Sequence, residues 1–289
     1  MSTINVDTVS PANYETVNVN NVQISSVNSS GSMRLGNIQA TVQGFYNTII
    51  GQSAVLSSTA SNNTAVGYLS GALLSTGQRN TFLGANSARN MTTGNNNVIL
   101  GDQAGYNALT TQSTVIIGND AGFNCTNSVN SVFIGSGAGQ GVGNLTGAHN
   151  VAIGAGSTLS SGSASNEFVL GSLSTYTLRC NVTTITSLSD ARDKKEIETL
   201  PVGLDFVNSL KPVKFVWDDR QEEGRHDVLD FGFIAQDLKA AQEEVDMADM
   251  LKLVYESNPE RLEASYGKLI PILVKAIQEL SEEVKQLKK

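Results

Sequence analysis

One short phrase, two apolar residues followed by glycine, recurs eight times between residues 48 and 171. Successive glycines are 16, 17, 17, 17, 17, 19 and 17 residues apart, and Asn or Thr usually stands just upstream. The glycines are Gly51, Gly67, Gly84, Gly101, Gly118, Gly135, Gly154 and Gly171. A period in this range is typical of stacked repeats, in which each unit contacts only its neighbours. This stretch is therefore expected to form an array rather than a globular core.

Each repeat is expected to contribute a short strand that ends at its glycine. Another small residue recurs four positions further on, at Gly71, Ala88, Gly105, Gly122 and Gly139. Small residues allow turns to stack closely, and Asn both tolerates left-handed turns and forms ladders. At one strand spacing of ~4.8 Å per repeat, eight repeats make a column about 35 Å long. Because one coil contains few large apolar residues, we expect three chains to share the interior of a trimeric β-helix or β-roll.

The charged residues divide the chain near residue 188. Residues 1–188 contain four of the 19 Lys and Arg residues and five of the 27 Asp and Glu residues, so seven of the eight excess negative charges lie in residues 189–289. The first part is rich in uncharged Asn, Thr, Ser, Gly and Val, whereas the second resembles an ordinary globular domain. The absence of a basic stripe argues against a nucleic-acid partner.

These observations predict four parts. Residues 1–43 contain short alternating Val/Asn stretches and are expected to form an attachment or capping segment. Residues 44–172 form the repetitive shaft, 173–188 a connecting strand, and 189–289 the C-terminal domain. The first residues lack the basic and apolar regions of a signal peptide, and no apolar run approaches ~18 residues. We therefore expect synthesis in the cytoplasm and no membrane insertion.

The two cysteines, Cys125 and Cys180, show neither a disulfide framework nor a metal-ligand spacing. Cysteine is often buried as a free thiol, and this is the expected state of both. No metal and no cofactor is expected.

The last predicted helix carries a heptad pattern. From Tyr266 onward, apolar residues follow a 4-3-4-3-4-3 spacing, and polar residues occupy the other faces. After Tyr266 this seam consists of Ile270, Leu273, Ile277, Leu280, Val284 and Leu287. Ile or Val at one seam position and Leu at the other would favour a dimer in an isolated coiled coil. We still expect a trimer, because three heptads do not determine the number of chains inside a larger domain. Pro271 indicates that the helix starts nearby or is kinked.

Four motifs follow one another in the C-terminal part. They are Ser-Asp-Ala-Arg-Asp-Lys-Lys at 189–195, Leu-Lys-Pro-Val-Lys-Phe-Val-Trp at 210–217, Phe-Gly-Phe-Ile-Ala-Gln-Asp at 231–237, and the start of the heptad helix at 266–280. In this order they resemble the intramolecular chaperone domain of phage tail fibres and endosialidases, the S74 peptidase family. A related domain occurs in membrane-tethered myelin regulatory factors. The resemblance implies an α+β chaperone domain that assembles a trimeric fibre and then cuts itself off.

The resemblance also implies which residues carry the chemistry. Ser189 would be the nucleophile and Lys194 its base, in a single-turnover serine endopeptidase that cuts the Leu188–Ser189 bond. A serine hydroxyl needs such a base, and lysine serves only when neutral, a form that burial or nearby cations such as Arg192 favour. The alternative for Ser189 is a helix N-cap without catalytic function.

Two further residues have two interpretations each, and a third has one. Asp190 is either a first-turn helix charge, which we favour, or a residue that orients the dyad. His226 is either a surface residue or a participant in cleavage. Trp217 is expected to fill the core of the domain.

The shaft motifs Ser-Val-Phe-Ile-Gly at 131–135 and Asn-Val-Ala-Ile-Gly-Ala-Gly-Ser at 150–157 resemble repeats in the heads of trimeric autotransporter adhesins and in viral fibres. Such a shaft is either a stiff spacer or a receptor-binding surface. The sequence as a whole predicts a homotrimeric viral tail fibre or appendage, located on the virion. The segment 1–43 would join it to other virion proteins, and a host-surface receptor is a further candidate partner.

Two alternatives stay open. One is a bacterial trimeric surface adhesin without enzyme activity, which would need an export signal and a membrane barrel that the sequence does not show. The other is a fibre with a permanent, non-cleaving C-terminal trimerisation domain.

Overall fold

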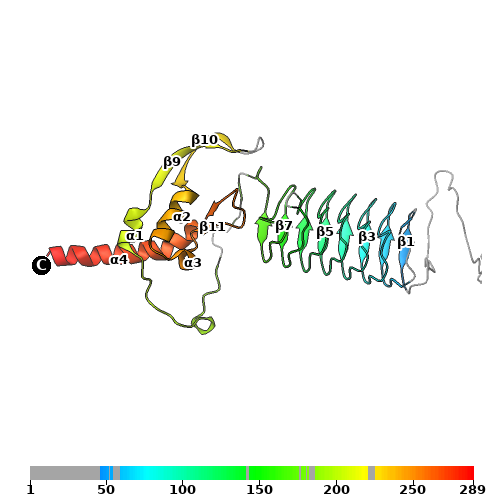
Figure 1. The fold of residues 1–289 in the computed structure, drawn as a ribbon, viewed down its shortest axis with the longest axis horizontal. Coiled ribbons are helices and arrows are strands. Elements are labelled where there is room, and N and C mark those ends of the chain that lie inside the picture. Colours follow the sequence, from blue (N-terminus) through cyan, green and yellow to red (C-terminus); the bar gives the residue numbers. More distant parts are fainter. Residues whose placement is uncertain are drawn as a thin grey trace, which may run out of the picture. The chain divides into compact units, whose positions relative to one another are not determined.

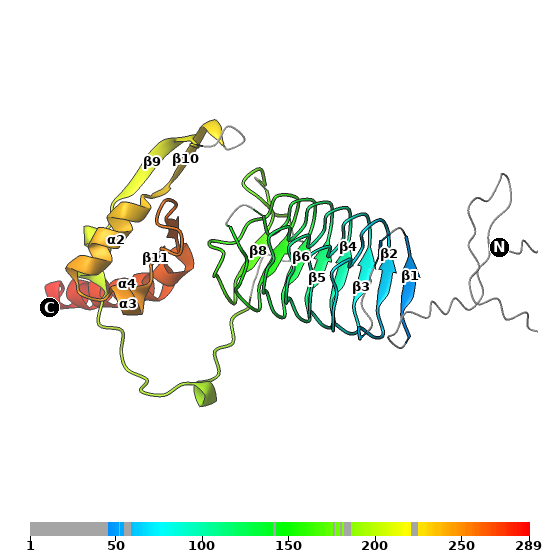
Figure 2. The same ribbon diagram turned by 45° about the vertical axis from the view of Figure 1, so that its right-hand side comes forward.

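The computed structural model describes residues 46–51, 53–54, 59–140, 143–175, 177–179, 181, 186–220 and 225–289. The predicted attachment segment, residues 1–43, and Cys180 lie outside this part of the chain. The described residues form a repetitive shaft and an α+β domain that ends in a helix (Figures 1 and 2). Among them, no helix combines the length and the apolar character needed to cross a membrane.

The shaft is a parallel β-solenoid with one strand in each coil. Its strands pair in sequence order to form one parallel sheet, and each lies in register with the next, as Val115–Ile117 does with Val132–Ile134 (Figure 1). The strands are β1 (Thr48–Ile50), β2 (Thr64–Val66), β3 (Thr81–Leu83), β4 (Val98–Leu100), β5 (Val115–Ile117), β6 (Val132–Ile134), β7 (Val151–Ile153) and β8 (Phe168–Leu170). The predicted stack of short strands, each followed by glycine, is confirmed.

The middle residue of each strand points into the coil. In β3 to β6 this residue is Phe82, Ile99, Ile116 and Phe133, all fully buried and paired with one another along the shaft. Alanines from the turns, such as Ala104, complete the same core. A single chain therefore closes every coil. The expectation of an interior shared by three chains was wrong, because alanine in the turns narrows each coil until few large side chains fill it.

Cys125 belongs to this core and is a buried free thiol, as predicted. Burial raises the pKa of the thiol to about 11, although hydrogen bonding with Thr111 acts in the opposite direction. Desolvation disfavours the thiolate, so this cysteine serves packing rather than chemistry.

The glycines after β1 to β6 are required by the close approach of successive coils. Gly101 has a φ of +132°, and a Cβ added there would lie 2.5 Å from the carbonyl oxygen of Gly118 in the next coil. An L side chain rarely adopts this backbone conformation. Any residue other than glycine would therefore have to push two coils apart.

A ladder of buried asparagines lies just before the strands. The side-chain oxygen of Asn80 accepts a hydrogen bond of 3.0 Å from the backbone N–H of Asn97, and the Asn80 amide donates to the Gly94 carbonyl at 2.8 Å. Asn63 and Asn97 make the same type of contact in their coils. The ladder thus satisfies backbone groups that the turn would otherwise leave buried and unpaired, a loss that costs roughly 1–3 kcal/mol each.

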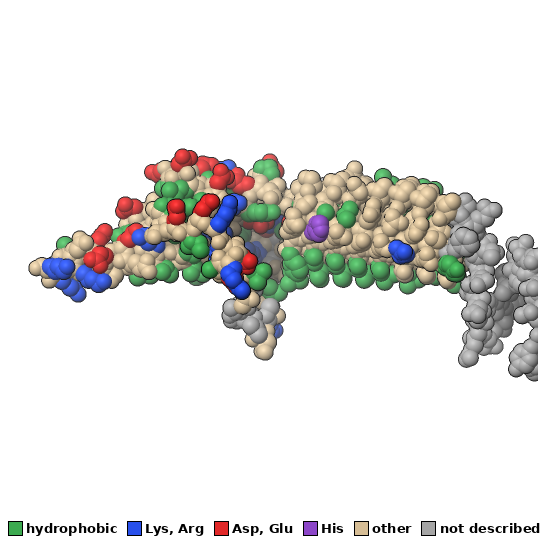
Figure 3. Space-filling model, turned by 90° about the horizontal axis from the view of Figure 1, so that it is seen from below, with side chains coloured by type: hydrophobic (Ala, Val, Ile, Leu, Met, Phe, Trp, Pro, Cys, Tyr) green, Lys and Arg blue, Asp and Glu red, His purple; other side chains and the backbone are tan. Residues whose placement is uncertain are grey.

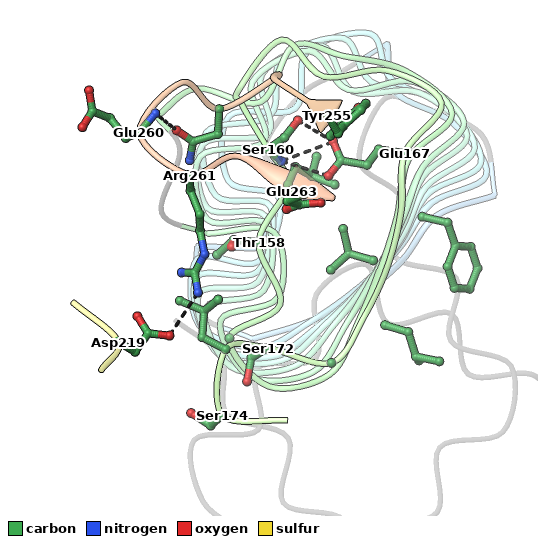
Figure 4. A pocket seen from close by; sticks show the side chains of 18 of the residues that line it. Thr158, Ser160, Glu167, Ser172, Ser174, Asp219, Tyr255, Glu260, Arg261 and Glu263 are labelled. Carbon is green, nitrogen blue, oxygen red and sulfur yellow. Dashed lines mark hydrogen bonds and ion pairs between the residues drawn. The ribbon is translucent and has the colours of Figure 1, made fainter. Parts of the chain in front are cut away.

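The ladder position in the last coils holds Asn150 and then Glu167. The backbone N–H of Glu167 donates to the Asn150 side-chain oxygen at 3.0 Å. The carboxylate of Glu167 in turn accepts hydrogen bonds from the N–H and the hydroxyl of Ser160, at 3.0 and 2.8 Å (Figure 4). A carboxylate therefore ties the last turn together where no further asparagine follows.

The C-terminal domain contains short helices, a two-stranded hairpin and a long last helix. Its elements are η1 (Ala191–Asp193), α1 (Leu204–Ser209), β9 (Pro212–Asp218), β10 (His226–Phe233), α2 (Ala235–Glu244), α3 (Ala248–Leu251), β11 (Val254–Tyr255), β12 (Glu263–Ala264), η2 (Tyr266–Lys268) and α4 (Leu269–Leu287). Strands β9 and β10 pair antiparallel, as do β11 and β12. This arrangement confirms the predicted α+β domain with a C-terminal helix.

One small core holds the domain together. Phe206 of α1, Leu238 of α2 and Ile272 of α4 are buried in it. The Glu279 carboxylate of α4 also accepts a hydrogen bond of 2.7 Å from the N–H of Leu204, at the start of α1. This bond lowers the pKa of Glu279 and fixes α4 across the N-terminus of α1.

The hairpin has its own polar and aromatic contacts. Arg261 pairs with Asp219 at 3.2 Å and connects the segment before β12 to the end of β9 (Figure 4). Trp217 is half-buried under the guanidinium of Arg225, 3.6 Å from its ring centre, and donates to Asp230 at 3.0 Å. It therefore lies in the hairpin and not in the domain core, contrary to the prediction, because its indole N–H finds a carboxylate on the neighbouring strand.

Candidate functional site

The candidate site lies around η1, between the shaft and the α+β core in the sequence. The Lys194 ammonium donates to the Ser189 hydroxyl oxygen at 2.5 Å and lies 3.4 Å from the Ser189 carbonyl oxygen. One tight turn brings the two side chains together, since the N–H of Lys194 bonds to the Ala191 carbonyl at 3.2 Å. The five-residue separation in the sequence thus becomes a direct contact.

Asp190 starts this turn. Its carboxylate accepts from the backbone N–H of Arg192 at 2.9 Å and pairs with the Arg192 guanidinium at 2.6 Å. These hydrogen bonds lower the pKa of Asp190 and raise the pKa of Arg192. The capping residue is therefore Asp190, so the alternative in which Ser189 itself caps the helix is wrong. Its hydroxyl is left to contact Lys194.

The bond that precedes Ser189 is open to solvent in the single chain. Leu188 is fully exposed, and the side chains of Ser189 and Lys194 are exposed as well. The contact between hydroxyl and ammonium is therefore formed by local backbone geometry alone. Nothing that the structure describes in one chain shields it from water.

His226 occupies a different place, at the start of β10. Its Nδ1 lies 3.2 Å from an Asp218 carboxylate oxygen on the paired strand β9. This contact belongs to the hairpin, whereas Ser189 and Lys194 flank η1. The structure places His226 in the hairpin, and its participation in cleavage stays a prediction.

The predicted heptad seam forms one face of α4. Leu269, Ile272 and Ala276, on the neighbouring stripe of the helix, are buried in the domain. The seam residues are between 40% and 86% exposed: Ile270, Leu273, Ile277, Leu280, Val284 and Leu287. The helix therefore has two adjacent apolar stripes, and the described part of its own chain covers only one of them.

Comparison with known families gives one match. Residues 189–247 match the family model described as the chaperone of endosialidase, Peptidase S74. No curated protein and no solved structure matches the chain. The chain thus combines a β-solenoid shaft with a C-terminal domain whose residues 189–247 match the chaperone-of-endosialidase model. Such a domain implies assembly of a homotrimer and a self-cleaving chaperone activity.

The match begins at Ser189, the residue that follows the exposed Leu188. It ends before β11, so α4 with its seam lies beyond the matched residues. Among the described residues, no cluster of His, Cys, Asp and Glu has an arrangement that could hold a metal ion.

Proposed function

We propose that this chain is a viral tail-fibre or appendage protein whose C-terminal domain assembles the homotrimer and then releases itself by cutting the Leu188–Ser189 bond. The observation that supports it most directly is the 2.5 Å contact between Ser189 and Lys194 at the start of the matched domain. The shaft supports the fibre part of the proposal, because a slender solenoid is a structural element rather than an enzyme body.

In the proposed reaction, the neutral amine of Lys194 takes the proton of the Ser189 hydroxyl. The oxygen then attacks the carbonyl carbon of Leu188, the bond to the Ser189 nitrogen breaks, and that nitrogen receives the proton. The resulting ester between Leu188 and the Ser189 side chain is hydrolysed by water. The products are a shaft that ends at Leu188 and a released domain that starts at Ser189.

We further propose that assembly precedes cleavage. A lysine acts as a base only in its neutral form, and this form is favoured by loss of water around it. Both members of the dyad are exposed in the single chain, so packing against neighbouring copies is the available source of burial. Cleavage would then report that three chains have come together.

Assembly by a separate domain also answers a kinetic problem. A stack of coils has a costly first contact between chains, whereas a globular trimer holds them at high local concentration. Once the shaft has formed, the domain is no longer required. Its removal leaves a fibre that is stable kinetically, since the element that started assembly is gone.

The test is a pair of substitutions with a matched control. Ser189→Ala and Lys194→Met are each expected to give the uncut chain on a denaturing gel, whereas Lys195→Met is expected to cut like the natural chain. Lys195 is exposed and adjacent to Lys194, and the ion pair that it makes among the described residues is with neighbouring Glu196 at 3.7 Å. The natural chain should show a released fragment whose first residue is Ser189.

Two results would separate the alternatives. Continued cutting of the Ser189→Ala chain at Leu188 would remove Ser189 from the mechanism. A natural chain that forms trimers but never yields the fragment would support the permanent trimerisation domain instead.

A further inference from the structure

One side of the shaft carries a continuous row of hydrophobic side chains (Figure 3). This row belongs to the face formed by the first and third residues of every strand, which point away from the coil because the middle residue points inward. We call this face the outer strand face: Thr48, Ile50, Thr64, Val66, Thr81, Leu83, Val98, Leu100, Val115, Ile117, Val132, Ile134, Val151, Ile153, Phe168 and Leu170. None of these residues is charged, and the only polar ones are threonines.

We infer that the outer strand face is the surface along which three copies of this chain contact one another, in parallel and in register. This inference rests on the proposed function, because it identifies where the proposed trimer holds its shaft together. The first residue of each strand in one copy would then lie against the third residue of the same coil in the next copy.

The absence of charge supports a contact between identical chains. In a parallel, in-register trimer, each residue lies at the same height as its two counterparts. A charged residue on this face would therefore meet like charges from both neighbours, which is destabilising. Arg79, Arg89, Asp102 and Asp120 all belong to the shaft, and every one of them lies outside the outer strand face.

The spacing of the coils supports the same partner. Successive rows of the face are separated by one strand spacing, ~4.8 Å. A second copy presents side chains at the same interval along the whole shaft. The first and third positions of the strands form two columns that differ: in β1 to β7 the first position holds Thr or Val, in β8 it holds Phe168, and the third position holds Ile, Leu or Val throughout. When the first column of one chain contacts the third-position column of the next chain, each interface joins two different surfaces. Three such interfaces close into a ring.

The size of the face explains why an assembly domain is useful. Seven intervals of ~4.8 Å and a width of roughly 10 Å give a footprint of about 340 Å². A standard interface buries about 800 Å² per partner, so this face alone is small for recruiting free chains from solution. It is sufficient once the chains are tethered, because the local concentration then replaces much of the missing affinity.

Cross-linking in the full chain tests the inference. Val115→Cys with Ile117→Cys would be introduced into an uncut Ser189→Ala chain in which Cys180 is replaced by Ser. A short bis-maleimide should then link three chains on a denaturing gel, whereas either cysteine alone should link two at most. The matched control places Asn127→Cys and Val129→Cys, with the same spacing, elsewhere on the same coil and should stay unlinked.

The native mass of the same sample separates this inference from the proposed function. A trimeric mass with links at 127 and 129 but none at 115 and 117 would overturn the outer strand face and leave the homotrimer intact. Free reaction of both 115 and 117 with a monofunctional maleimide in a trimer would also overturn it and would leave the face to another ligand. A single-chain mass would overturn both proposals.

A second variant guards against a failure of the cysteine chemistry. In the cleaving chain, Ile117→Glu with Ile134→Glu should still allow release of the domain but should give a shaft that sediments as one chain. Asn127→Glu with Thr146→Glu, two exposed positions away from the face, should leave the shaft trimeric. A trimeric shaft in the first variant would overturn the inference.

Discussion

At the scale of single residues, the shaft depends on positions where the chemistry allows little choice. Glycine follows β1 to β6 because the next coil lies too close for a Cβ, and asparagine precedes several strands because its amide satisfies buried backbone groups. Both residues recur in the sequence at or near the repeat interval. The physical reason for each became visible only when successive coils were placed together.

The close contact of coils makes a prediction about Gly101. Gly101→Ala should lower the stability of the shaft by more than Gly137→Ala, measured as the shift in thermal unfolding by circular dichroism. Both residues have positive φ, a conformation that costs a non-glycine residue about 1–3 kcal/mol. Only at Gly101 would the new Cβ also meet backbone, since Gly137 faces only the end of the Gln140 side chain at 3.6 Å. Equal shifts for the two variants would contradict the argument.

At the scale of elements, α4 and the strands share a property. Each has one apolar face inside its own chain and a second apolar face outside it: the heptad seam on α4 and the outer strand face on β1 to β8. An apolar surface that its own chain leaves uncovered along a whole element is a candidate interface. The two surfaces are candidates for successive stages of one assembly, with the seam acting first.

The seam has its own test. Ile277→Glu with Leu280→Glu should keep the domain folded, because both side chains are exposed in the single chain, but should prevent formation of the trimer. Like charges brought together at the seam would oppose association. Sedimentation of the uncut Ser189→Ala chain measures the outcome. Gln278→Glu adds a charge on the same helical turn off the seam and should have no effect; a trimer in the seam variant would argue for another contact.

At the scale of the whole molecule, one polypeptide would contain both the domain that directs assembly and the shaft that is assembled. The domain contains most of the charge and its own small core, whereas the shaft has few charged residues and is built from contacts between adjacent coils. To form a trimer, such a shaft needs another part of the chain to bring three copies together first. Cleavage would then make assembly irreversible, because the domain that started it is removed.

This view predicts a difference in refolding. After denaturation and dilution, the uncut Ser189→Ala chain should recover its trimer, whereas the purified shaft ending at Leu188 should recover little of it. The tether supplies the effective concentration that three separate shafts lack. Adding back the released domain as a separate fragment should not help. Equal recovery of the cut shaft and the uncut chain would contradict the assembly function.

The sequence alone determined the elements that a period or a motif encodes. The recurrence of apolar residues before glycine located the strands from Thr48 to Leu170, and the order of four motifs located the chaperone domain, since both signals depend on residues close together in the chain. Pairing of Ser189 with Lys194 was likewise within reach, because one turn separates them.

Only the tertiary structure decided which side of each strand is inside and how many chains close a coil. A strand of three residues does not state which way its middle residue points, and that choice buried Phe82 and Phe133 and left Leu83 and Ile134 on the surface. It also placed Asp190 rather than Ser189 at the cap and Trp217 in the hairpin. These outcomes depend on the width of a coil and on contacts between strands, which arise only when distant residues pack.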